Sequence, residues 1–290
     1  MYHYFQIVLY NSSKTLPKLL NSLISAQKPE GTKVVLHLRD QSENEEEHKK
    51  IKKILGENRS EDLEYVLTKG ENIGFGRGHN TLFNDLTKVT HSDFFILNPD
   101  GLIFDDFFIE FQKHLDYFER SAENGFKWGM LEIHQFPAEH PKEYDPANLR
   151  TNWVSCAAVF IDRDMFVATN GFDDNIFMYG EDVDLSMRSK ILGYELYHLP
   201  TVRFVHISYG LDHDKDNSFI NKYIPASEMY LRHKYMGEDN VMEFETKLLN
   251  HPFRNEIIAI YNKLSKNLTD EYLGKIDLLP YKGTYARHRW

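Results

Sequence analysis

The sequence predicts an α/β fold with a mostly parallel central sheet and a C-terminal helical extension. In residues 1–100, short apolar runs alternate with segments whose apolar residues recur at helical spacing, which is typical of parallel βαβ units. From residue 224 to residue 268, helical patterns follow one another and indicate two or three helices packed onto the sheet domain. The composition permits a large core, because 41% of the 290 residues are hydrophobic and 14% are aromatic.

The first half of the chain alternates regularly between the two kinds of pattern. The best helical pattern has Leu16, Leu19, Leu20 and Leu23 on one face, with Pro17 in its first turn. The apolar runs are short and rich in Val, Ile, Leu and Phe, as in buried strands. We therefore expect strands at residues 5–10, 33–38, 63–67 and 93–97, and helices at residues 15–26, 43–55 and 80–89.

The second half is less regular. Residues 136–150 form a polar, proline-bearing loop, and a loop of that length within a compact domain is often functional. The polar run GLDHDKDNS is expected to be a linker. We expect helices at residues 105–122, near Met165 and after Gly180, and strands at residues 127–133, 153–161 and 194–199.

Composition excludes several classes of protein. The net charge of −10 argues against a general nucleic-acid binder, which needs a basic face for phosphates. The single cysteine, Cys156, permits no internal disulfide and suits a reducing compartment. No apolar run approaches the roughly 20 residues that span a bilayer, and the start MYHYFQIVLYNS lacks the basic region of a signal peptide. We expect a soluble cytoplasmic protein, peripheral at most at the inner face of the cell membrane.

Polar residues follow the predicted strands at their carboxyl ends. Asp40, the glycines of ENIGFGRGHN and Asp100 all occupy such positions, where parallel α/β sheets bind their ligands. We therefore expect them to share one site. In LNPD, Asn98 and Asp100 have oxygen atoms suited to Mg²⁺ or Mn²⁺, although an Asn-Pro-Asp-Gly β-turn explains the same residues.

The glycine-rich stretch also has two interpretations. Gly74 and Gly76 permit the close backbone approach that a loop against a diphosphate needs. A plain tight turn is the alternative. The spacing GxGxG does not match the dinucleotide fingerprint GxGxxG, so it does not indicate a dinucleotide cofactor.

The stretch GFDDNIFMYGEDVDLSMRSKILGYELYHLPTVRFVH is the most organised in the chain. Val183, Met187 and Ile191 recur every four residues and give a helix an apolar stripe. Asp184 and Arg188 are expected to pair on the exposed side of that helix and to contribute about 0.2–0.5 kcal/mol.

Two residues of this stretch are candidates for chemistry. Asp182 lies at the predicted N-terminal edge of the helix, where it can face a cleft; a simple helix cap is the alternative. His206 ends an apolar strand, and it is either a metal ligand or a core or rim residue. Cys156, within an apolar strand, is expected to be an inert packed thiol.

Together these pieces resemble the inverting family 2 glycosyltransferases, in particular their rhamnosyltransferase-like branch. The matching motifs are VLYN, RDQS, NIGFGRGHN, LNPD, VSCAAVFIDRDMF and the long stretch above, in the right order over residues 7–208. The resemblance implies a GT-A (Rossmann-like nucleotide-diphospho-sugar transferase) fold. It divides residues 1–215 into a nucleotide-binding half, about 1–100, and an acceptor-binding half, 101–215, followed by the helical extension 216–290.

The resemblance also implies roles for individual residues. Asp182 would be the catalytic base, and Asp100 and His206 would bind Mg²⁺ or Mn²⁺ on the diphosphate. Asn98 replaces the first acid of the family's DxD motif, and Cys156 stands where related sequences often carry glycine. The implied donor-binding residues are Asn11, Asp40, Asn72, Gly74, Gly76, Asn98 and Asp100, and the implied acceptor-binding residues are Trp153, Tyr179 and Glu181.

The resemblance implies transfer of a sugar, L-rhamnose from dTDP-rhamnose, to a glycan or lipid-linked glycan in surface polysaccharide biosynthesis. One alternative keeps the fold and uses a UDP-hexose, UDP-N-acetylhexosamine or UDP-galactofuranose donor. Others are a non-catalytic nucleotide-sugar or glycan-binding protein and a metal-dependent hydrolase. The basic, aromatic tail YKGTYARHRW suits either contact with anionic lipid or a solvated end. The oligomeric state is not predicted.

Overall fold

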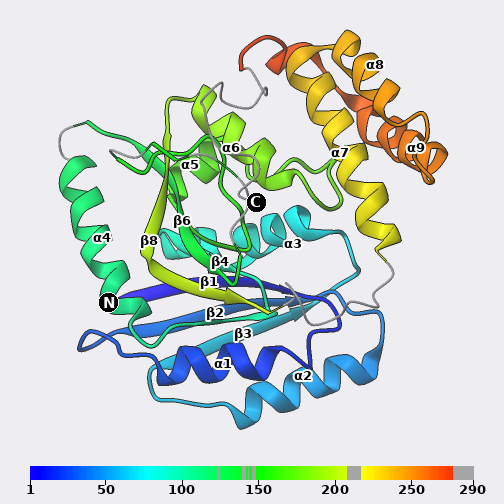
Figure 1. The fold of residues 1–290 in the computed structure, drawn as a ribbon. Coiled ribbons are helices and arrows are strands. Elements are labelled where there is room, and N and C mark those ends of the chain that lie inside the picture. The colour runs from blue at the N-terminus through cyan, green and yellow to red at the C-terminus, as the bar shows by residue number, and fades with distance from the viewer. Residues whose placement is uncertain (123–124, 139–141, 143, 146–147, 208–216, 277–290) are drawn as a thin grey trace.

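The computed structural model describes residues 1–122, 125–138, 142, 144–145, 148–207 and 217–276. Eight strands form one sheet in the order β3-β2-β1-β4-β7-β6-β8-β5, and helices cover both of its faces (Figure 1). This mixed α/β architecture confirms the predicted fold class.

The first half of the sheet is parallel. Strands β3, β2, β1 and β4 pair in that order and in the same direction. Helices α1 and α2 lie against one face of these strands and α3 against the other (Figure 1). The bounds are β1 Tyr2–Leu9, α1 Leu16–Ser25, β2 Lys33–Asp40, α2 Glu45–Glu57, β3 Leu63–Lys69, α3 Phe75–Leu82 and β4 Phe94–Leu97.

The second half of the sheet is mixed. Strand β7 runs antiparallel to β4 and to β6, whereas β6 and β8 are parallel and β5 is antiparallel to β8. The predicted parallel order therefore holds for the first half, and the sheet changes direction where β7 joins β4. The bounds are β5 Gly101–Ile103, α4 Phe107–Ala122, β6 Trp128–Phe136, β7 Ala158–Ile161, α5 Arg163–Ala168, α6 Glu181–Ile191 and β8 Glu195–His206.

Several predicted boundaries were wrong. Helix α3 begins at Phe75 inside the glycine-rich stretch, and the expected helix at residues 80–89 is partly a π turn and a 3-10 turn. Only the last four residues of the expected strand 153–161 are extended. Strand β8 runs on to His206 because it pairs first with β6 and then with β5, a strand too short for its sequence to reveal.

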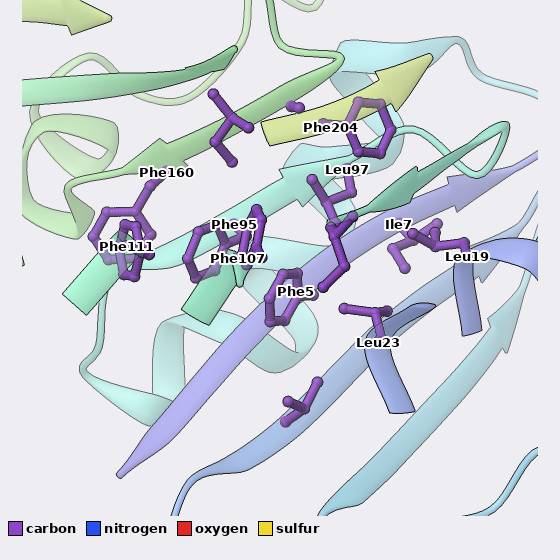
Figure 2. Close-up of a cluster of buried hydrophobic side chains, with 14 of the residues drawn as sticks. Phe5, Ile7, Leu19, Leu23, Phe95, Leu97, Phe107, Phe111, Phe160 and Phe204 are labelled. Carbon is purple, nitrogen blue, oxygen red and sulfur yellow. The ribbon is translucent and has the colours of Figure 1, made fainter. Parts of the chain in front are cut away.

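The core is built from stacked phenylalanine rings between the sheet and its helices (Figure 2). Phe5 and Phe95 on neighbouring strands stack with centroids 4.4 Å apart, and Phe111 of α4 packs edge-on against Phe95 at 4.6 Å. Leu19 and Leu23 of α1 are fully buried, as their spacing predicted. Each such burial stabilises the fold by about 1.5–3 kcal/mol.

Three helices follow the sheet and confirm the predicted helical extension: α7 (Ser218–Met236), α8 (Glu238–Lys247) and α9 (Arg254–Leu264). The first of them packs against the segment that precedes α6 (Figure 1). The expected linker falls mostly, and the basic tail wholly, outside the described residues, and the boundary at residue 216 stays a prediction. No helix in the part of the chain that the structure describes has the length and apolarity needed to cross a bilayer.

Candidate active site

Strand pairing brings the two predicted metal ligands together. Gly101 lies opposite His206 in the antiparallel β5–β8 pair, so Asp100 and His206 meet at the end of both strands. The Asp100 carboxylate is 3.3 Å from His206 Nε2, and the Asn98 side-chain nitrogen is also 3.3 Å from that atom. Gly101 is required here, because a Cβ atom would lie 2.0 Å from the Phe204 ring.

The residues at this corner suit a hard divalent cation. A carboxylate and a side-chain amide oxygen are ligands that both Mn²⁺ and Mg²⁺ accept, and Mn²⁺ also takes an imidazole nitrogen. The part of the chain covered by the structure contains no group of three or more His, Cys, Asp or Glu residues that could hold a metal alone. Asp100, Asn98 and His206 thus fit a cation that takes its remaining oxygen ligands from a diphosphate.

The carboxylates Glu181 and Asp182 open helix α6. Tyr179 and Gly180 precede them with φ of +67° and +85°, and these two left-handed residues turn the chain sharply into the helix. The Asp182 carboxylate accepts a hydrogen bond from its neighbour, Val183 N, at 2.8 Å. Positive φ at a tyrosine is strained, and such strain is concentrated at functional sites.

Burial perturbs both carboxylates. It raises the pKa of Asp182, while backbone N–H groups of Val183 and Cys156 and the Lys142 ammonium act in the opposite direction. Burial also raises the pKa of Glu181, and the charge of Asp182 raises it further. Within the described residues, Oε2 of Glu181 is buried without a hydrogen-bond partner. This acidic pair can therefore hold or exchange a proton near neutral pH.

A short chain of contacts links Asp182 to the predicted metal corner. The backbone N–H of Asn98 donates to the Ala157 carbonyl at 2.8 Å. The backbone N–H of the preceding residue, Cys156, lies near enough to Asp182 to lower the pKa of that carboxyl. Asn98 and Asp182 thus both lie against adjacent residues of one segment, just ahead of β7. Cys156 itself is fully packed, as expected, and burial raises the pKa of its thiol.

Asp40, one of the predicted donor-binding residues, is buried within the protein. Its Oδ2 is 2.7 Å from His48 Nδ1, and its Oδ1 accepts a hydrogen bond from Ser42 N at 2.9 Å. The Ser42 hydroxyl in turn accepts from Asn11 N at 2.9 Å. Asp40 therefore orients Ser42, which is also buried, and through it the exposed Asn11, at the carboxyl ends of β1 and β2. Sequence reasoning missed His48, because its contact depends on how α2 packs.

The glycine-rich stretch packs against the segment that leads to α6. A Cβ atom on Gly74 would lie 2.1 Å from the Phe177 carbonyl oxygen, and one on Gly76 would lie 2.8 Å from Phe172 Cβ. The Asn72 side chain accepts from Gly74 N, and Gln41 Nε2 donates to the Gly74 carbonyl at 3.0 Å. Protein packing alone therefore requires glycine at positions 74 and 76.

The predicted acceptor side contains a buried ion pair that sequence reasoning missed. The Lys142 ammonium lies 4.3 Å from the centre of the Trp153 ring, donates to the Trp153 carbonyl at 3.1 Å and pairs with Glu132. Glu132 also accepts from Ser155 N at 3.0 Å. In the sequence, only the length of the loop at residues 136–150, which carries Lys142, indicated that this region could be functional.

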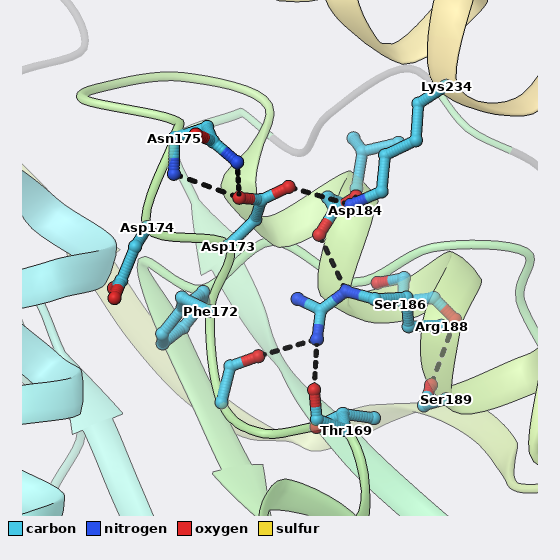
Figure 3. A network of polar contacts seen from close by, with 12 residues as sticks. Thr169, Phe172, Asp173, Asp174, Asn175, Asp184, Ser186, Arg188, Ser189 and Lys234 are labelled. Atoms are coloured by element: carbon cyan, nitrogen blue, oxygen red, sulfur yellow. Dashed lines mark hydrogen bonds and ion pairs between the residues drawn. The ribbon is translucent and has the colours of Figure 1, made fainter. Parts of the chain in front are cut away.

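The predicted Asp184–Arg188 pair forms, but the prediction that it is exposed was wrong. Asp184 is 0% and Arg188 5% exposed, because Lys234 and Tyr235 of α7 contact Asp184 and the segment before α6 packs against Arg188 (Figure 3). Lys234 of α7 donates to Asp184 at 2.6 Å and to Asp173 at 2.7 Å. Arg188 also donates to the carbonyls of Thr169 and Gly171. This network fastens the segment before α6 to the helical extension.

A cavity of about 310 Å³ lies beside this network. It is lined by residues 169–170, 172–175, 267–269 and 271–272 and by Arg188, Tyr230 and Lys234, and it includes neither Asp100, Asp182 nor His206. Three of its charged side chains, Asp173, Arg188 and Lys234, already form ion pairs within the protein, so we take the corner described above as the candidate site.

The chain is similar to known glycosyltransferases in sequence and in fold. No protein-family model matches the chain. It is 30% identical to the Escherichia coli K12 rhamnosyltransferase WbbL over 98 residues, 32% of this chain and 36% of that protein. It is also 30% identical to the Mycobacterium tuberculosis N-acetylglucosaminyl-diphospho-decaprenol L-rhamnosyltransferase over 69 residues, 24% of this chain and 22% of that protein. The matches therefore span well under half of either relative.

Solved structures extend the likeness to the whole fold. The crystal structure of Staphylococcus aureus TarS residues 1–349 matches with a TM-score of 0.54 and 13% identity, over 92% of this chain and 81% of that one. GalNAc-T7 with UDP, GalNAc and Mn²⁺ matches with a TM-score of 0.59 and 12% identity, over 91% and 54% of the two chains. The protein thus has the GT-A fold of glycosyltransferases, and its sequence is similar to that of rhamnosyltransferases, as the family 2 motifs implied.

Proposed function

We propose that the protein is an inverting glycosyltransferase that moves L-rhamnose from dTDP-rhamnose to a hydroxyl group of a growing glycan, in surface polysaccharide biosynthesis. One observation carries the proposal. Two separate carboxylate sites, Asp100 with His206 and Asp182 with Glu181, are linked through the segment before β7. Sugar transfer from a nucleoside diphosphate needs one site for the leaving diphosphate and another for the attacking hydroxyl.

In this proposal Asp182 is the catalytic base. Its carboxylate takes the proton of the acceptor hydroxyl while that oxygen bonds to the anomeric carbon and the bond to the diphosphate oxygen breaks. Attack from the face opposite the diphosphate inverts the anomeric configuration and requires no covalent intermediate. The raised pKa of Asp182 supports this role, because a carboxylate of higher pKa is a stronger base.

The leaving diphosphate would lie at the corner formed by Asn98, Asp100 and His206. These residues would hold Mg²⁺ or Mn²⁺, which would neutralise the charge that develops on the diphosphate. Asn98 contributes no charge, so Asp100 supplies the negative charge of the corner. His206 Nε2 faces the Asp100 carboxylate across the β5–β8 pair, so both could reach one cation.

The nucleoside would lie along the carboxyl ends of the parallel strands. We propose that Asn11, Asn72 and the backbone of Gly74 and Gly76 line this side of the donor site. Asp40 contributes indirectly: its carboxylate accepts a hydrogen bond from Ser42 N, and the Ser42 hydroxyl accepts one from Asn11 N. We assign Trp153, Tyr179 and Glu181 to the acceptor side, because they flank Asp182 in the chain or pack near it.

Rhamnose is favoured as the donor sugar because the two sequence relatives are rhamnosyltransferases. A UDP-hexose, UDP-N-acetylhexosamine or UDP-galactofuranose donor is the alternative, because TarS binds UDP-GlcNAc and the Pyrobaculum calidifontis mannosyltransferase PcManGT binds GDP-Man with Mn²⁺ on the same fold. The name of the mycobacterial relative supports a lipid-linked N-acetylglucosaminyl diphosphate as acceptor. Transfer to such a lipid would take place at the inner face of the cell membrane, with the protein in the cytoplasm.

The test is a transfer assay with synthetic N-acetylglucosaminyl diphosphate lipid and a panel of dTDP-, UDP- and GDP-sugars. Asp182→Asn should reduce transfer about 10²–10⁴-fold, the contribution of a general base, and should bind the donor nucleotide as wild type does. Asp164→Asn is the matched control, because the Asp164 side chain is 81% exposed and remote from the site.

Three other outcomes of these experiments would contradict the proposal. Equal transfer by wild type and Asp182→Asn would mean that another group is the base. Donor binding without transfer by either protein would favour a nucleotide-sugar-binding protein. Release of sugar to water without an acceptor would indicate a hydrolase.

A further inference from the structure

Four aromatic rings gather beside the proposed catalytic base, and they come from two distant parts of the chain. Phe177 and Tyr179 belong to the segment before α6, and Phe219 and Tyr223 to the first turns of α7. The Phe219 and Tyr223 rings stack with centroids 4.2 Å apart. Phe177 lies 5.8 Å from Tyr223, and Tyr179 lies 6.1 Å from Phe219. We call these four residues the aromatic platform.

The platform has a defined position relative to the site. Tyr179 is three residues before Asp182, and its left-handed backbone turns the chain into α6. On one side, the Phe177 carbonyl accepts a hydrogen bond from Phe75 N at the start of α3. On the other, Ser227 of α7 donates to the Met178 carbonyl at 3.4 Å. The platform therefore bridges the donor-side glycine stretch and the helical extension.

Contacts within the protein leave part of the aromatic platform exposed to solvent. Phe219 is 39% exposed, whereas the core phenylalanines are almost completely buried. A solvent-exposed phenylalanine stacked on a half-buried tyrosine, on the helix that packs against the segment leading to the candidate base, is unfavourable in water and is typical of a binding surface. Two of its four members, Tyr179 and Tyr223, also carry hydroxyl groups. A surface with apolar faces and polar edges suits a ligand of the same character.

We propose that the aromatic platform is the subsite for the acceptor sugar, with the C–H face of a pyranose ring against Phe219 and Tyr223 and its hydroxyl directed to Asp182. This inference rests on the proposed function and names residues of the helical extension as part of the acceptor site. A hexopyranose has an apolar C–H face and a polar rim, which match the ring faces and hydroxyl edges of the platform. A lipid chain has no polar rim, so it would make no use of the hydroxyl edges of the platform.

Steady-state kinetics with two acceptors test this proposal. The probes are N-acetylglucosaminyl diphosphate carrying an octyl chain and the same sugar diphosphate carrying a decaprenyl chain. Phe219→Ala should raise the acceptor KM about 5- to 10-fold with both probes, because stacking on one aromatic ring is worth about 1–1.5 kcal/mol. The donor KM should stay unchanged. Phe219→Tyr, which keeps the ring, should retain the wild-type acceptor KM.

Ile224→Ala is the matched control, because Ile224 is 46% exposed on the same helix and lies outside the platform. It should change neither KM. A loss confined to the decaprenyl probe, or an equal loss with Ile224→Ala, would overturn the sugar subsite in favour of a lipid contact. An unchanged acceptor KM in Phe219→Ala would also overturn it.

A binding measurement separates this inference from the proposed function. Saturation-transfer NMR of the octyl probe with dTDP present reports contact with the sugar protons without turnover. Wild type that binds the probe but transfers no sugar would contradict the proposed function, while loss of the sugar signals in Phe219→Ala would still support the platform. Equal sugar signals in both proteins would overturn the platform even if transfer occurs.

Discussion

Lys234→Met tests whether the helical extension holds the segment before α6. The Lys234 ammonium donates to Asp173 and Asp184 at 2.7 and 2.6 Å, and its side chain is only 5% exposed. Removing one partner of a buried ion pair costs about 3–5 kcal/mol, because the other charge is left buried without compensation. Asp184 keeps its bond to Arg188, and Asp173 keeps one to Tyr230. We therefore expect a loss near 3 kcal/mol in the free energy of unfolding.

Urea unfolding followed by circular dichroism measures this loss. Lys113→Met is the control, because Lys113 pairs with Glu110 at 2.6 Å while its side chain is 65% exposed, and such a surface pair contributes at most about 1 kcal/mol. A loss in Lys234→Met no larger than that of the control would refute the reasoning. The double variant Lys234→Met with Asp173→Asn should regain part of the stability, because it removes the unpaired acid beside the methionine while Asp184 keeps its pair with Arg188.

Three further predictions concern the site and its supports. Asp100→Ala should abolish the effect of Mn²⁺ on the thermal stability conferred by the nucleoside diphosphate, since ligands stabilise the state they bind; an Mn²⁺ effect equal to that of wild type would exclude Asp100 as a ligand. Gly74→Ala should unfold at lower urea than Gly31→Ala, because its Cβ would meet the Phe177 carbonyl, while Gly31, also at positive φ, has open space around it. Burial tends to raise the pKa of Asp173, but Lys234 and Tyr230 outweigh it and lower the pKa to about 2. The resulting stability is fully present above the ordinary carboxylate pKa near 4 and is lost as pH falls towards 2, so acid unfolding should begin at higher pH in Lys234→Met.

The sequence by itself determined the elements and their order in the first half. Leu16, Leu19, Leu20 and Leu23 are all buried, because helical spacing places them on one face and α1 has only the sheet to cover that face. The strands β1 to β4 were predictable for the same local reason, since an apolar run between turn residues has few other stable conformations in water. The candidate residues Asp40 and Asp100 could be predicted because they lie at the carboxyl ends of these strands.

Only the tertiary structure decided which residues meet. Asp100 and His206 are joined by the three-residue strand β5, whose pairing with β8 is a long-range event without a local pattern. Asp184 and Arg188 appeared exposed because periodicity within α6 describes one helix, whereas their burial depends on α7 and on the segment before α6, which pack against them. Local sequence determines the faces that each element offers, and long-range packing then decides which of those faces remain in contact with water.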